Sequence, residues 1–76
     1  MTLDDAVSTA HDDVVVTAVD LPTAQRRRLA ELGLRPGSPV RVVKRAAGGG
    51  LVLALGTSRV AIDRSTSTHI TVDPVS

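Results

Sequence analysis

A helix stop followed by a change of hydrophobic period is the feature that most constrains how this chain can fold. The run from Leu29 to Leu34 contains a glycine, Gly33, directly after Leu32. Glycine at that position accepts the left-handed backbone of a Schellman cap, in which Leu29 and Leu34 make the apolar contact. The pattern therefore predicts a short α-helix over residues 22–32 that ends abruptly.

After the helix stop, apolar and polar residues alternate, which is typical of strands with one buried face. Pro36-Gly37 predicts a type II turn, since proline fits the second position of that turn and glycine the third. Two hairpin loops are expected, at residues 46–50 and at Gly56-Thr57, and one helical turn at residues 63–68. The apolar runs predict five short strands, over residues 14–19, 39–45 and 51–55, around Val60 and Ile62, and over residues 70–72.

These elements predict a mainly β fold, namely a small SH3-like barrel of about five strands. One short α-helix follows the first strand, and a one-turn helix precedes the last. Closing so short a sheet on itself removes exposed strand edges and makes the most of a small core. We expect residues 14–73 to form this single domain, and residues 1–13, which are polar with weak periodicity, to form a mobile or loosely packed N-terminal lead.

The composition excludes several classes of function. The 76 residues contain no cysteine and no Phe, Tyr or Trp, so the core must come from 12 Val, 8 Leu and 2 Ile, filled out by Ala. Without cysteine there is no disulfide framework and no thiolate metal site. Without aromatic rings, base stacking on single-stranded nucleic acid and grooves for proline-rich peptides are disfavoured.

No feature of the sequence indicates a membrane span or a secretory leader. The longest apolar run, residues 51–55, is far shorter than the roughly 20 residues needed to cross a bilayer. Asp4 and Asp5 lie where a signal peptide carries positive charge. We therefore expect a cytoplasmic protein.

The formal net charge of +1 hides a strong asymmetry along the chain. Residues 1–20 hold five aspartates and no lysine or arginine, whereas residues 21–45 hold six arginines and one lysine against the single acid Glu31. Such a distribution favours a basic face that binds an acidic partner or phosphates. The alternative is that the acidic lead folds back over the basic middle of the chain.

The triplet Arg26-Arg27-Arg28 is the sharpest local charge feature. On a helix these side chains span about 200° of arc, so they cannot all point inward. Glu31 is spaced to pair with Arg27 or Arg28. We expect a protein partner rather than nucleic acid, because no other residues offer base readout. The candidate partner-binding residues are Arg26, Arg27, Arg28, Arg35, Arg41 and Arg45.

Catalytic and metal-binding motifs are weak. No nucleophile elbow is present, and Gly48-Gly49-Gly50 lacks the Lys-Ser/Thr ending and the helix of a phosphate-binding loop, so we expect no enzyme activity. His11 stands beside two aspartates, and His69 is two residues from Thr71. Neither spacing preorganises a divalent cation, so only weak binding of ferrous or another transition metal ion is expected from these residues.

Residues 28–43 resemble the signature of FeoA-type proteins, R-L-x-x-L-G-L-x-P-G-x-x-V-x-V, and read RLAELGLRPGSPVRVV. The segment over residues 56–62 and the closing residues 70–72 are also similar to that family, so the resemblance covers residues 14–72. Three turns depart from the family pattern, at residues 8–13, at Gly50 and at residues 65–67. Most signature positions serve the fold as caps, turns and core, namely Leu29, Leu32, Gly33, Leu34, Pro36, Gly37 and Gly56.

The resemblance implies a small SH3-like cytoplasmic accessory protein of bacterial ferrous iron uptake. Its implied partner is the FeoB-type membrane transporter, through the cytoplasmic portion of that protein, and self-association remains open. A second interpretation is a stand-alone relative of the SH3-like domain that ends DtxR-type iron-dependent repressors, where a metal-sensing role would need ligands near the first strand and Asp20 is the candidate. A third is a nucleic-acid-binding small barrel, which rests on the arginines alone.

Overall fold

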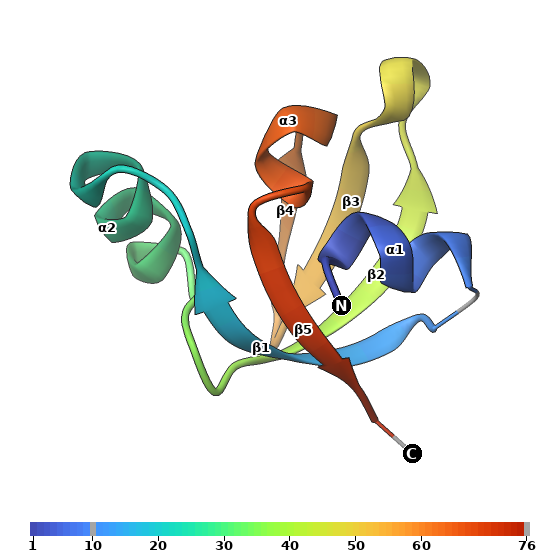
Figure 1. Ribbon diagram of the computed structural model, residues 1–76, viewed down its shortest axis with the longest axis horizontal. Helices are drawn as coiled ribbons and strands as arrows, with labels where there is room; N and C mark the ends of the chain where they lie inside the picture. The colour runs from blue at the N-terminus through green and yellow to red at the C-terminus, as the bar shows by residue number, and fades with distance from the viewer. Residues whose placement is uncertain (10, 76) are drawn as a thin grey trace.

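In the part of the chain that the structure describes, five antiparallel strands form one sheet and three short α-helices lie around it (Figure 1). The computed structural model describes residues 1–9 and 11–75. The elements in chain order are α1 (Leu3–Ser8), β1 (Asp13–Val19), α2 (Thr23–Glu31), β2 (Pro39–Arg45), the 3-10 turn η1 (Ala47–Gly49), β3 (Leu51–Leu55), β4 (Ser58–Ile62), α3 (Arg64–Ser67) and β5 (Ile70–Pro74). None of the described helices is long and apolar enough to cross a bilayer. The predicted mainly β fold of five strands is confirmed.

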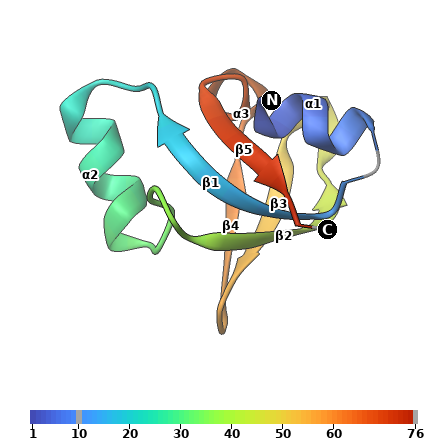
Figure 2. The same ribbon diagram turned by 60° about the horizontal axis from the view of Figure 1, so that its bottom comes forward.

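The sheet has the strand order β4-β3-β2-β1-β5, and every neighbouring pair is antiparallel. Closure of the sheet into a barrel, as expected from the sequence, is not found: among the described residues β4 and β5 are the two edges and do not pair with each other. Register shifts between Val42 and Lys44 in β2 and between Val16 and Ala18 in β1 mark irregularities of the kind that bend strands. The sheet is therefore strongly curved but open (Figure 2).

The predicted alternation places aliphatic side chains on the inner face of each strand. In β3 the leucines are buried and the residues between them are half-buried. In β2, Val40 and Val42 are buried whereas Arg41 and Val43 are exposed. The buried core comprises Leu3, Ala6, Val14, Val16, Val19, Leu34, Val40, Val42, Leu51, Leu53, Leu55, Ile62, Ile70 and Val72.

The predicted helix stop is also confirmed. Gly33 has a φ of +100°, its N–H donates to the Ala30 carbonyl at 3.0 Å, and the Leu34 N–H donates to the Leu29 carbonyl at 2.8 Å. These two hydrogen bonds define a Schellman cap. In the next turn Gly37 has a φ of +92°, which is the left-handed position of a type II turn. Helix α2 thus ends where the sequence predicts.

The first residues of the chain differ from the loosely packed lead expected above. Residues 3–8 form α1, whose Leu3 and Ala6 are fully buried in the core. The Val72 N–H donates to the Met1 carbonyl at 2.7 Å, so the start of the chain covers the outer edge of β5. Thr2 is the N-cap of α1, and its side chain accepts a hydrogen bond from the Asp5 N–H at 3.1 Å. Threonine is a favoured N-cap residue, so this position is one sign of a helix start that the sequence itself carries. With only six residues, α1 is too short for its sequence to show a hydrophobic period.

Candidate partner-binding surface

Helix α2 extends beyond the sheet, at the opposite end of the molecule from α1 (Figures 1 and 2). None of its residues is buried. Leu29, together with Leu21 just before the helix, is half-buried and packs against the core, and Leu32 at the C-cap is 47% exposed. The helix therefore presents most of its surface to solvent, and that surface carries the arginine triplet.

One side of α2 forms what we call the arginine groove, with a volume of about 410 Å³. Arg26 and Arg27 come from the helix, and Arg35 comes from the loop that follows the Schellman cap. None of the carboxylates that the structure describes lines this groove. Its apolar lining consists of Val19, Ala30, Leu34 and Pro36. The structure thus brings three of the six predicted arginines together over an aliphatic surface.

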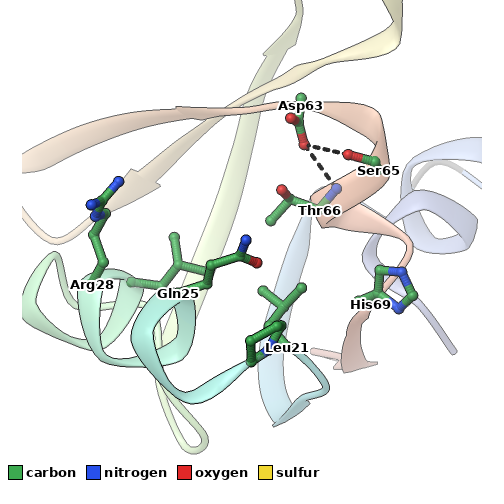
Figure 3. Close-up of a pocket in the computed structure, with 9 residues that line it drawn as sticks. Leu21, Gln25, Arg28, Asp63, Ser65, Thr66 and His69 are labelled. Atoms are coloured by element: carbon green, nitrogen blue, oxygen red, sulfur yellow. Dashed lines mark hydrogen bonds between the residues drawn. The ribbon is translucent and has the colours of Figure 1, made fainter.

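Arg28 lies in a different groove, between α2 and α3, with a volume of about 490 Å³ (Figure 3). Successive helical residues are rotated by about 100°, so Arg28 is separated from the arginine groove although it adjoins Arg27 in sequence. Figure 3 shows Arg28 at one end of this groove and His69 at the other, with Asp63 facing α2 from the start of α3. The predicted pairing of Glu31 with Arg27 or Arg28 is wrong, since no such ion pair exists among the described residues.

Asp63 organises the α3 wall of this second groove. Its Oδ1 accepts hydrogen bonds from the Thr66 N–H at 2.8 Å and from the Ser65 hydroxyl at 3.0 Å, and so caps α3 (Figure 3). The hydrogen bonds from Thr66, with that from Ser65, hold the pKa of Asp63 below its ordinary value of 3.8. Sequence reasoning assigned these residues to a turn and did not place them opposite α2, because the contact joins segments that are distant along the chain.

We expect the stability of the protein to fall as the pH drops below 3.8, in part because of Asp63. The pKa of this carboxyl is lower in the folded state than in the unfolded state, so its contribution is present at higher pH and is lost as protonation removes the cap. Thermal unfolding between pH 2 and pH 6, about two units to either side of the ordinary pKa, measures this loss. Asp63→Asn should flatten the acid limb of the curve, and an unchanged limb in this variant would show that the cap does not contribute.

The remaining two predicted arginines, Arg41 and Arg45, lie at the other end of the sheet. The Arg41 guanidinium donates two hydrogen bonds to the Asp13 carboxylate, at 2.9 and 3.2 Å, and these lower the pKa of Asp13 and raise that of Arg41. Arg45 donates to the Val7 carbonyl of α1 at 3.3 Å. The alternative that the acidic lead folds over the basic middle therefore holds for β2 but not for α2.

The three candidate metal ligands do not form a metal centre. Asp20 and His69 are neighbours through their backbones, since the Asp20 N–H donates to the His69 carbonyl at 2.8 Å, and both residues are exposed. His11 lies before β1, at the other end of that strand from Asp20. Within residues 1–9 and 11–75, no three His, Cys, Asp or Glu side chains gather closely enough to hold a metal ion. The described residues therefore offer no set of three side-chain ligands of the kind that holds a zinc ion.

Comparison with known proteins identifies the family. The FeoA domain family matches residues 1–74. A FeoA protein from Chlorobium tepidum is 30% identical, with a TM-score of 0.88 over 100% of this chain and 71% of that one. Stenotrophomonas maltophilia FeoA in complex with zinc is 34% identical, with a TM-score of 0.69 over 96% of this chain and 89% of that one. That protein is described as a prokaryotic SH3 domain protein and a candidate activating factor of bacterial ferrous iron transport.

Cadmium-bound ScaR shares the fold at 17% identity, with a TM-score of 0.81 over 96% of this chain and 35% of that one. No curated protein matches the chain by sequence. The family match begins at residue 1, so it includes the buried helix α1 as well as the strands of the SH3-like fold expected from the sequence. Because the match extends over almost the whole chain, the protein belongs to the FeoA family.

Proposed function

We propose that this protein is a cytoplasmic accessory protein of bacterial ferrous iron uptake that binds the cytoplasmic portion of a FeoB-type transporter and performs no catalysis of its own. The observation that carries the proposal is the protruding helix α2, which buries no residue and bears arginines without ion pairs among the described residues. A role in iron transport is supported by the S. maltophilia relative, which is described as a candidate transport activating factor.

The physical role that we propose follows from the exposure of helix α2. A small domain of this kind changes the activity of a transporter only if it binds one conformation of that transporter more tightly than another. Helix α2 is joined to the core through Leu21, Leu29 and its Schellman cap, and its exposed cationic side chains supply the electrostatic attraction. The candidate contact residues are Arg26, Arg27 and Arg35, with Arg28, Arg41 and Arg45 outside the arginine groove.

Titration calorimetry with the cytoplasmic portion of the FeoB-type transporter from the same cell tests the proposal. We expect saturable binding that weakens as salt is raised, because exposed charges are screened beyond about 8–10 Å at physiological ionic strength. Absence of binding at low salt would contradict the proposed partner. Duplex and single-stranded DNA are the matched controls, since salt-sensitive binding to either at random sequence would favour the nucleic-acid interpretation instead.

A direct metal-sensing role is the second candidate function, and the backbone contact between Asp20 and His69 is the observation in its favour. Two side chains are fewer than a stable transition-metal site requires. Titration with ferrous, manganous and zinc ions alone, on the wild type and on Asp20→Ala, decides the matter. Micromolar binding that is lost in the variant, without any binding to the transporter portion, would support metal sensing.

A further inference from the structure

The arginine groove is the one strongly cationic surface that the described residues leave without a complement. At the opposite end of the molecule, acids and bases share their grooves. Asp4 lines one with Arg45 and Arg64, and Asp12 and Asp13 line another with Arg41 and Arg59. The arginine groove contains three guanidinium groups and no acid. Among the described residues, no carboxylate is therefore placed to pair with these three arginines, which leaves them available to the carboxylates of another molecule.

The aliphatic lining of the groove limits the chemistry of that molecule. Val19 and Leu34 are 7% and 1% exposed and form the buried floor of the groove, so its water-exposed apolar surface comes from the half-buried Ala30 and the exposed Pro36. A phosphate group alone would satisfy the guanidinium groups but would leave this apolar surface in contact with water. A peptide segment in which carboxylates flank an aliphatic side chain matches both the arginines and the apolar lining. Each carboxylate can accept two parallel hydrogen bonds from a guanidinium group, and the aliphatic side chain covers the apolar lining.

A second copy of the chain is a poor occupant of the groove. Two copies related by a twofold axis would bring six guanidinium groups together, which is unfavourable in an interface. In a head-to-tail contact Asp13 would have to release Arg41, with which it pairs at 2.9 Å, and such a contact does not close in a pair but repeats into a ring or an open filament. Charge complementarity therefore favours a different protein.

Contact with another molecule would stabilise helix α2. A nine-residue helix is marginal in water, and helices of this length owe most of their stability to packing. Here only the two ends are fixed, by the Leu21 and Leu29 contacts and by the Schellman cap. An occupant of the groove would contact the helix along its exposed side and protect its hydrogen bonds.

We propose that the arginine groove binds a short acidic segment of the partner protein, in which Asp or Glu residues flank an aliphatic side chain, and that binding stabilises α2. This inference rests on the proposed function for the identity of the partner. Arg26 and Arg27 pair with the carboxylates from the helix side, and Arg35 pairs from the loop side. The aliphatic side chain lies on Ala30 and Pro36, the apolar lining residues that solvent reaches, above the buried Val19 and Leu34.

Binding of the transporter's cytoplasmic portion to charge-reversal variants tests the groove. Arg26→Glu/Arg27→Glu and, separately, Arg35→Glu should each raise the Kd at low salt, the double variant by at least about tenfold. Arg59→Glu, an exposed arginine on β4 outside the groove, is the matched control and should change the Kd by less than about threefold. Circular dichroism of each variant confirms that the fold is kept.

Two synthetic peptides test binding to the arginine groove without the transporter. A peptide containing Glu-Glu-Leu-Glu-Glu should bind the wild type and slow the hydrogen exchange of the α2 amides, whereas its Gln-Gln-Leu-Gln-Gln counterpart should not. If the transporter portion binds wild type and all variants equally, the groove proposal is overturned while the proposed function stands. If the acidic peptide binds but the transporter portion does not, the proposed function fails and the groove stands. Binding only to phosphatidylserine vesicles would overturn the inference.

Discussion

Replacing Leu3 with alanine is expected to lower the free energy of unfolding by about 2–5 kcal/mol. The Leu3 side chain is fully buried among strand residues, and truncation removes its transfer free energy and leaves a cavity in the core. A domain of this size has a total stability of roughly 4–11 kcal/mol, so the variant should be close to unfolding. Urea denaturation followed by circular dichroism measures the change.

Ser8→Ala is the control for this prediction because it lies on the same helix and is exposed. It removes only the hydrogen bond from the Ser8 hydroxyl to the Asp4 carbonyl, and we expect a change within about 0.5 kcal/mol. A loss of stability in Leu3→Ala no greater than in Ser8→Ala would show that α1 is not part of the core, as the loosely packed lead expected from the sequence would require.

Leu34→Ala should have a comparably large effect, a loss of about 2–5 kcal/mol. Leu34 is 1% exposed, and its backbone N–H closes the Schellman cap at the Leu29 carbonyl. The truncated side chain no longer holds the end of α2 to the core, so the helix should also open more often. Native-state hydrogen exchange of the α2 amides should therefore accelerate more than that of the β3 amides.

Leu32→Ala is the matched comparison, because it removes the same atoms two residues earlier from a side chain that is 47% exposed. We expect this variant to lose less than about 1 kcal/mol and to leave the exchange of α2 nearly unchanged. Equal losses in the two leucine variants would contradict the interpretation that Leu34, rather than the helix surface, fixes α2 to the sheet.

The same residue links the fold to the candidate binding surface. Leu34 belongs to the buried core and also lines the arginine groove. Arg35 immediately follows it, so the cap that ends α2 also places a guanidinium opposite Arg26 and Arg27. The family signature around residues 28–43 therefore serves the fold directly and the candidate surface indirectly.

The elements that the sequence predicted well are those whose cause is local. Alternation along β3 needs only residues 51–55, and the helix stop needs only Leu29 to Leu34 and one glycine. The helical turn before β5 follows from the capping side chain of Asp63. Interactions between residues a few positions apart are set by the chain itself, so a pattern is enough to predict them.

The features that the sequence missed depend on contacts between distant segments. The packing of α1 follows from its position over β5, with Thr2 bridging to Thr71, and six residues are too few to reveal that in a pattern. The expected closure of the barrel was wrong for a related reason, since the start of the chain covers the edge of β5 while β4 remains the other edge of the sheet.

By itself the sequence determined the strands, the stop of helix α2, the absence of aromatic binding surfaces and an excess of positive charge in the middle of the chain. The sequence alone did not determine which of the arginines lie together in space. The tertiary structure separated six arginines into a groove of three, one residue facing α3, and two at the end occupied by the acidic lead. Helical rotation and the strand order made that division, because side chains adjacent in sequence point to different faces while distant ones meet.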